Sequence, residues 1–83
     1  MFFCYILRGQ KDFHYCGITG HIAKRIKRHN AGKSKSTRKH IPLVIIHTAI
    51  FSSMASARIK EVQIKNQGVK RWYLKHVRFR TVV

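Results

Sequence analysis

Residues 15–30 read Y-C-G-I-T-G-H-I-A-K-R-I-K-R-H-N, and this stretch predicts a strand, a sharp turn and a basic helix in direct succession. Tyr15 and the residues after it favour extended structure. Gly20 allows the turn, and Ile22 and Ile26, four positions apart, begin the period of a helix. The fold is therefore expected to be built around a strand-turn-helix unit.

The predicted helix carries two polar side chains on its apolar side. At about 100° per residue, Arg25 and His29 fall inside the stripe that Ile22 and Ile26 begin. The remaining cations lie on the opposite side, where a solvated helix keeps its charges: Lys24, Lys27 and Arg28. Arg25 therefore needs a reason other than solubility. For His29 a structural role, bonded to a backbone carbonyl, stays open beside a chemical one.

The sequence before this unit predicts a β-hairpin. Residues 2–7 and 13–19 form two antiparallel strands joined by a turn at residues 9–11. A turn centred on position 10 pairs Cys4 with Cys16 and Tyr5 with Tyr15. Because side chains alternate along a strand, both tyrosines share one face of the sheet even if the register shifts by two. The cysteines are then a cross-link or, more commonly, two small buried thiols.

The sequence after this unit predicts a third strand and two further helices. The first helix spans residues 21–31 and stops at Gly32, and a polar, basic loop covers residues 33–41. The nearly continuous apolar run at residues 43–51 predicts a strand covered on both faces. A serine at position 52 or 53 caps a helix that runs to position 66 or 67 and ends at Gly68. Residues 69–77 predict a third, shorter helix.

These elements define the expected fold class and domain organisation. The class is α/β (α+β): a small three-stranded antiparallel sheet flanked by helices, in the order β-β-α-β-α with a short C-terminal helix. A chain of 83 residues can bury one modest core. We therefore expect one domain over residues 1–83.

The tyrosine spacing resembles the GIY-YIG endonuclease superfamily. Phe3-Cys4-Tyr5 corresponds to the first half of the motif and Tyr15-Cys16-Gly17 to the second; an arginine follows Tyr15 after ten residues and a histidine four later. The loop with Gly32-Lys33, Ser36-Thr37-Arg38 and Pro42-Leu43, and the segment Glu61-Val62-Gln63-Ile64-Lys65, are similar to the small single-domain bacterial members. The similarity covers about residues 3–66. Cysteines in place of aliphatic residues, and Ser36 in place of an aromatic one, remove no catalytic group.

This resemblance implies a metal-dependent endonuclease that hydrolyses phosphodiester bonds in DNA, for instance in repair or recombination. It implies a catalytic set of Tyr5, Tyr15, Arg25, His29 and Glu61. Glu61 is then the ligand of a divalent metal, Mg²⁺ or alternatively Mn²⁺. One carboxylate suffices for Mg²⁺, which keeps several waters and takes substrate phosphate as a further ligand. The alternative is a nucleic-acid-binding module that keeps the fold and cuts weakly or not at all.

Glu61 also stands out by elimination. The chain has two acidic residues, and Asp12 falls in the hairpin turn, where aspartate serves local hydrogen bonding. Glu61 shares a helix face with Ala57 and Ile64, so it is the acid placed for chemistry. On the residues alone, a structural ion pair with Arg25 or a lysine is the favoured interpretation, and the resemblance reverses this preference.

The charge indicates a polyanionic partner. Eighteen Lys and Arg against two acids give a net charge of +16, which nucleic acid neutralises best, DNA being the leading candidate. The residues expected to bind it are Lys24, Lys27, Arg28, Lys33, Lys35, Arg38 and Lys39. A basic protein of membranes or ribosomes would explain the charge but neither Glu61 nor the tyrosines. We expect a cytoplasmic protein that binds no membrane, with a partner protein as one source of specificity.

Other chemistry-bearing residues give weaker signals. The histidines outside the first helix's apolar stripe show no zinc-like spacing, and no metal is assigned to them: His14, His21, His40, His47 and His76. Trp72, Tyr73 and Phe79 alternate with cations near the C-terminus. Base stacking and core packing both remain open for these aromatic residues.

Overall fold

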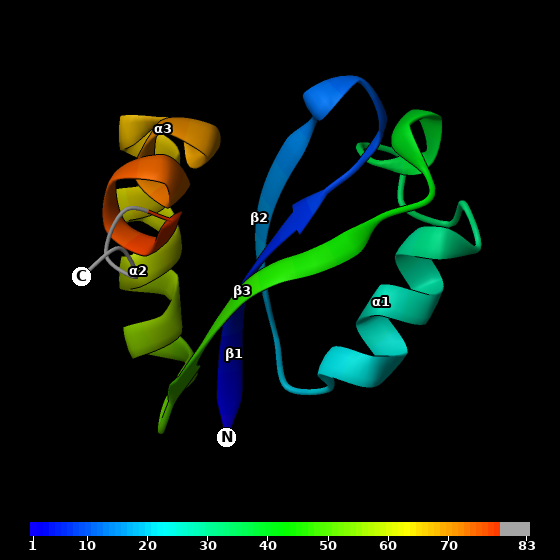
Figure 1. Cartoon of the computed structure of the whole chain (residues 1–83). Coiled ribbons are helices and arrows are strands. Elements are labelled where there is room, and N and C mark those ends of the chain that lie inside the picture. Colours follow the sequence, from blue (N-terminus) through cyan, green and yellow to red (C-terminus); the bar gives the residue numbers. More distant parts are fainter. Residues whose placement is uncertain (79–83) are drawn as a thin grey trace.

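The computed structural model describes residues 1–78 and places a three-stranded sheet between helices (Figure 1). The elements in chain order are β1 (Phe2–Arg8), a 3₁₀ turn (Gln10–Asp12), β2 (His14–Thr19), α1 (Ile22–Asn30), a second 3₁₀ turn (Arg38–His40), β3 (Val44–Phe51), α2 (Met54–Gln67), α3 (Val69–Tyr73) and a π-helical turn (Leu74–Arg78). The strands are antiparallel in the order β2-β1-β3. The expected class and element order are confirmed.

The hairpin register differs from the predicted one by two residues. Tyr5 faces Gly17 and Cys4 faces Ile18, instead of Tyr15 and Cys16. The turn lies one residue later than predicted, because Lys11 and Asp12 adopt φ of 60° and Arg8 Nε donates to Asp12 Oδ1 at 3.2 Å. A shift of two preserves the alternation of side chains. Both tyrosines therefore still lie on the same face.

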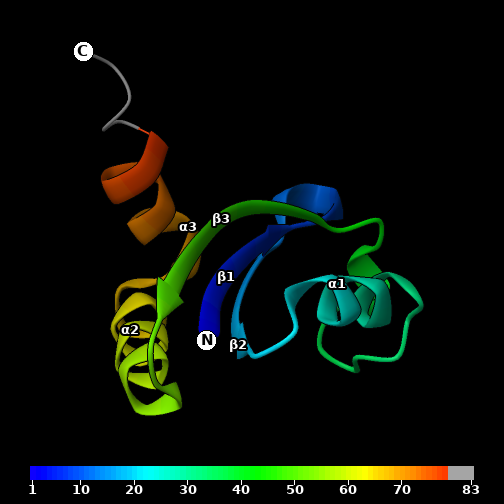
Figure 2. The same cartoon turned by 90° about the horizontal axis from the view of Figure 1, so that it is seen from below.

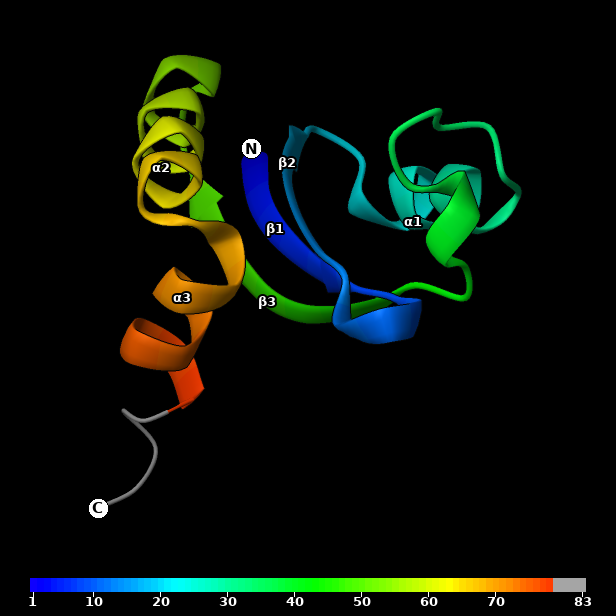
Figure 3. The ribbon, with the colours of Figure 1, turned by 90° about the horizontal axis from the view of Figure 1, so that it is seen from above.

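Two apolar clusters hold the helices on opposite faces of the sheet, as Figures 2 and 3 show for α1 and α2. Under α1, the buried residues Tyr5, Leu7 and Leu43 meet Ile22 and Ile26 of the helix. Under α2 and α3, the cluster contains Cys4, Ile6, Cys16, Ile64 and Trp72. Trp72 is thus core, and Phe79 lies outside the described residues.

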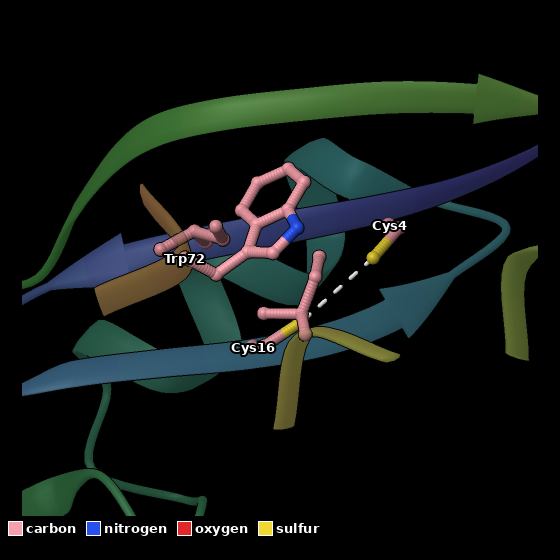
Figure 4. Close-up of a cluster of buried hydrophobic side chains, with 5 residues drawn as sticks. Cys4, Cys16 and Trp72 are labelled. Atoms are coloured by element: carbon pink, nitrogen blue, oxygen red, sulfur yellow. Dashed lines mark hydrogen bonds between the residues drawn. The ribbon is translucent and has the colours of Figure 1, made fainter. Parts of the chain in front are cut away.

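The two cysteines are diagonal neighbours within the second cluster. Both are free thiols, and their Sγ atoms lie 3.7 Å apart beside Trp72 (Figure 4). Each side chain is about 1% exposed. They therefore act as small apolar core residues of the sheet.

The prediction that β3 is covered on both faces is wrong. Val44 and Ile50 are 57% and 61% exposed, and Ile45 is 39% exposed. β3 is an outer strand, and the cluster under α1 takes residues from β1 and β2 but none from β3. A continuous apolar run does not distinguish an edge strand from a buried one.

The helix ends follow the predicted signals. Ser53 caps α2, its Oγ accepting from the Ser56 backbone N–H at 3.1 Å. Gly32 and Gly68 adopt φ of 75° and 90°, a region in which glycine is favoured, and terminate α1 and α2. The side chain of Asn30, at the end of α1, exchanges hydrogen bonds of 3.0 and 2.7 Å with the backbone of Leu43, which fixes α1 against the start of β3. Among residues 1–78 there is no helix with the length and apolarity needed to cross a membrane.

Candidate active site

Tyr5 stands at the centre of the face that α1 covers. It is 1% exposed and comes from the middle strand. Its ring lies across the neighbouring strand at Gly17: a Cβ at that position would be 2.5 Å from the Tyr5 hydroxyl oxygen and 3.1 Å from the Tyr15 ring. Real Cβ atoms do not approach so closely. Because Gly17 has no side chain, the Tyr5 ring can occupy the space above it.

A chain of hydrogen bonds leads from Tyr5 into the loop after α1. The Tyr5 hydroxyl is 3.0 Å from His29 Nε2, and His29 Nδ1 is 2.8 Å from Thr37 Oγ1. His29 and Thr37 are 1% and 0% exposed. Sequence reasoning placed His29 at the site but gave Thr37 no role, because nothing in its loop position indicates that it is buried.

Burial controls the acidity of the phenol. Burial away from solvent is the main cause that raises the pKa of Tyr5 to about 12, and the adjacent Tyr15 is the second cause. The positive charge of Arg25 acts in the opposite direction. Tyr5 is therefore protonated at neutral pH. Arg25 is half-buried on α1, as its place beside the apolar stripe predicted.

Tyr15 lies on the same face, nearer the edge of the sheet. Its ring centre is 6.4 Å from that of Tyr5 and 5.3 Å from that of His29. β2 is the outer strand on this side, so Tyr15 is partly exposed. The Lys65 Nζ, from α2 beyond that edge, lies 5.8 Å from the centre of the Tyr15 ring.

Glu61 approaches this group from the other face of the sheet. It belongs to α2, and its side chain is 12% exposed. Oε2 is 3.2 Å from Lys65 Nζ, and Oε1 is 3.8 Å from Arg58 Nε. Lys65 thus contacts both Glu61 and Tyr15 around the edge of β2. The structure brings the tyrosines, Arg25 and His29 together, and connects Glu61 to them through this one lysine.

The carboxylate of Glu61 fits a sparsely coordinated metal ion. Within residues 1–78 no three His, Cys, Asp or Glu side chains gather as a ligand set. A single, largely buried carboxylate matches Mg²⁺, which retains waters and binds substrate phosphate. The ion pairs with Lys65 and Arg58 equally match the structural interpretation of Glu61, so substitution has to separate the two.

The predicted nucleic-acid-binding residues are all exposed. Lys24, Lys27, Arg28 and Lys33 line, with Ala31, a surface hollow of about 350 Å³. A smaller one of about 200 Å³ is lined by Thr19, His21, Lys24, Arg25 and Arg28. The two hollows share Lys24 and Arg28. The outer surface of α1 therefore carries adjoining cationic hollows that begin at Arg25.

His29 is expected to titrate below the ordinary histidine value. Burial, then the charges of Arg25 and Arg28, lowers its pKa from 6.5. The unfolded chain then binds more protons, so His29 stabilises the fold above pH about 6.5 and this contribution is lost as the pH falls. His47 shifts in the same direction, so residue-resolved NMR titration is the right measurement. A His29 midpoint at or above 6.5 would contradict the prediction.

Comparison with known proteins identifies similar chains. A UPF0213 protein of Staphylococcus haemolyticus is 36% identical over 64 residues, covering 76% of this chain and 78% of the relative. One of Nitratidesulfovibrio vulgaris is 32% identical over 68 residues, covering 81% of this chain and 62% of that longer relative. The solution NMR structure of a UPF0213 protein from Bacillus halodurans is similar with a TM-score of 0.54 and 32% identity, covering 86% of this chain and 78% of that one.

A family model extends the match across both halves of the tyrosine motif, α1 and α2. The model, described as the GIY-YIG catalytic domain, matches residues 1–74. This family indicates a nuclease-type hydrolase, whereas the UPF0213 names carry no activity. The chain belongs to the GIY-YIG catalytic domain family.

Proposed function

We propose that this protein is a metal-dependent endonuclease that hydrolyses phosphodiester bonds in DNA. One observation carries the proposal: Tyr5, Tyr15 and His29 form a compact group beside Arg25, and Lys65 connects that group to the partly buried carboxylate of Glu61. Phosphodiester hydrolysis needs an activated water and stabilisation of charge on phosphorus oxygens. This group contains candidates for both tasks.

Each residue has a role suited to its surroundings. Arg25 offers a planar, permanently charged donor set for a phosphate oxygen, and its half-buried position strengthens such a contact. Tyr5 activates the attacking water and Tyr15 positions the scissile phosphate. With a pKa of about 12, Tyr5 acts as a base only when its phenolate is stabilised, which the neighbouring donors favour. His29 hydrogen-bonds to Tyr5 and so maintains its orientation.

Glu61 would hold the metal, with Mg²⁺ the first choice and Mn²⁺ the second. When bound, such an ion supplies charge stabilisation and helps the leaving oxygen. Lys65, whose Nζ is 3.2 Å from the carboxylate, would have to move away for Glu61 to hold a metal. A lysine released from Glu61 remains beside Tyr15, where phosphate would be bound.

The exposed cations provide the binding surface. The adjoining hollows on α1 begin at Arg25 and reach Lys33, so they can bind neighbouring phosphates of one strand. Lys35, Arg38 and Lys39 extend the surface along the loop. We propose a cytoplasmic protein of one domain over residues 1–83 that acts in repair or recombination, and a partner protein as one source of specificity.

Replacing Lys35 and Arg38 together is expected to weaken the salt dependence of DNA binding without unfolding the protein. Each phosphate contact contributes about 0.9 to the slope of log affinity against log salt, so the double variant should lose up to about 2 from that slope. Arg71→Ala with Lys75→Ala is the matched control, since both are exposed on the α3 side and remove the same charge. The DNA affinity of the wild type and of both double variants is measured over a range of salt concentrations. Equal slopes for the two double variants would contradict the assignment of this loop.

The proposed activity is tested by incubating the pure protein with plasmid, branched DNA and RNA, with and without Mg²⁺ or Mn²⁺. Metal-dependent cleavage of DNA is the expected result. Cleavage of RNA alone would reassign the substrate. Binding without cleavage of any substrate would favour the second candidate, a binding module on the same fold, for which the +16 charge is the supporting observation.

A further inference from the structure

Thr37 lies at one end of a buried chain of hydrogen bonds that contains one more hydrogen than its gaps can take. The chain runs Thr37 Oγ1, His29 Nδ1, His29 Nε2, Tyr5 Oη, with spacings of 2.8 and 3.0 Å across its two gaps. With a neutral imidazole there are three hydrogens: one on threonine, one on histidine and one on tyrosine. Two gaps take two of them. One hydroxyl hydrogen, at one end or the other, must therefore point out of the chain.

At the Thr37 end, a hydroxyl hydrogen that points out of the chain would have no acceptor. Thr37 is 0% exposed, and among residues 1–78 its hydroxyl has no hydrogen-bond partner other than His29. Leaving a buried hydroxyl hydrogen without an acceptor costs about 1–3 kcal/mol. Tyr5, at the other end, is also buried, at 1% exposed, but it lies beside Tyr15 and Arg25 of the proposed active site, where a water or a substrate oxygen would accept its hydrogen. The surplus hydrogen belongs at the Tyr5 end.

We propose that Thr37 is a positioning residue that donates to His29 Nδ1 and thereby makes His29 donate, through Nε2–H, to the oxygen of Tyr5. The inference rests on the proposed function, but the direction of the chain can be measured in the protein alone. His29 then holds Tyr5 as an acceptor and not as a donor. The hydrogen of Tyr5 points towards the substrate.

This direction suits a tyrosine that must become a phenolate. When Tyr5 loses its outward hydrogen, the Nε2–H donor already points at the oxygen, and no histidine hydrogen has to move. In the opposite direction, Tyr5 would donate to Nε2, and its deprotonation would pass through a charged imidazolium. Burial and the charges of Arg25 and Arg28 disfavour that form, since they lower the pKa of His29.

Ring-nitrogen NMR of the ¹⁵N-labelled wild-type protein tests the direction without any substrate. At a pH above 6.5, where His29 is neutral, long-range ¹H–¹⁵N correlations distinguish the two tautomers. The expected result is a single Nε2–H form for His29. An Nδ1–H form would overturn the proposal, because Thr37 would then be the acceptor. This outcome is independent of cleavage, so failure of the nuclease assignment and failure of this inference are separable.

Two variants test whether Thr37 donates to His29 Nδ1. Thr37→Val keeps the shape and removes the hydroxyl, and Thr37→Ser keeps the hydroxyl. We expect the hydrogen bond to Nδ1 to be lost in Thr37→Val, which shifts the Nδ1 resonance towards that of a free imine nitrogen, and to be kept in Thr37→Ser. The rate constant of cleavage should fall about tenfold in Thr37→Val with unchanged DNA affinity, and recover in Thr37→Ser. A Thr37→Val protein with an unchanged Nδ1 resonance and wild-type cleavage would overturn the role, and if that variant does not fold, the wild-type spectrum still decides the direction.

Discussion

Replacing Glu61 with glutamine is expected to remove metal-dependent cleavage while DNA binding survives or becomes tighter. Glutamine keeps the shape of the side chain and one acceptor oxygen but loses the charge that a divalent cation requires. Loss of one preorganised electrostatic group costs about 10²- to 10³-fold in rate, and we expect at least that. Binding should not suffer, since a negative charge has left a surface that meets phosphate. Cleavage with and without Mg²⁺ and salt-titrated affinity measure the two effects.

Asp12→Asn is the matched control for this substitution. Asp12 is the other acid of the chain and also pairs with two cations, Arg8 and Lys70. It lies in the hairpin turn, where asparagine tolerates the φ of 60°. This variant should cut at the wild-type rate. If Glu61→Gln is well folded, less stable and still cuts with metal, then Glu61 is only the partner of Lys65 and Arg58, and the proposed mechanism fails.

Gly17→Ala is expected to damage both stability and cleavage. The added Cβ would lie 2.5 Å from the Tyr5 hydroxyl oxygen and 2.7 Å from Cζ, so the ring has to move within a packed core. Overpacking of this kind costs about 1–3 kcal/mol in the free energy of unfolding. The displaced hydroxyl also leaves His29 Nε2, which is 3.0 Å away in the wild type. Thermal melts and cleavage rates should therefore fall together.

Gly20→Ala is the matched control for Gly17→Ala. It replaces a glycine in the same segment where an added Cβ makes no close contact. A Cβ at position 20 would meet Phe2 at 3.7 Å, an ordinary contact distance. We expect its melting temperature and cleavage rate to stay near wild-type values. Equal damage in the two alanine variants would show that Tyr5 is not what excludes a side chain at position 17.

Local patterns predicted most of the elements, because turns, caps and periodicity act between near neighbours. Ser53, Gly32 and Gly68 set helix ends through local backbone chemistry, and the alternation of side chains placed Tyr5 and Tyr15 on one face. The predicted hairpin register was wrong by two residues. The register depends on the backbone conformation of the turn residues, and a turn of this composition can adopt several conformations. Exposure of β3 was missed because it depends on which strand lies in the middle.

The candidate site was predictable as a set of residues and not as an arrangement. Strand alternation and helix period gave Tyr5, Tyr15 and Arg25 a common direction. Glu61 lies on a helix that packs on the other face, and its connection through Lys65 depends on the edge position of β2, which no pattern within α2 encodes. Thr37 is separated from His29 by a loop, so its burial follows from the path of that loop.

The middle position of β1 also affects how the protein is made. β1 precedes both of its neighbours in the chain, and one of them, β3, begins at Val44. A ribosome therefore delivers the hairpin partner at once but has to add residues 20–43 before the other edge of β1 can be paired. During that interval Phe3 and Ile6 stand in a strand with one open edge, the kind of edge that templates association between chains. α1 closes over one face of the hairpin but leaves this edge open, so the edge stays unpaired until β3 is added.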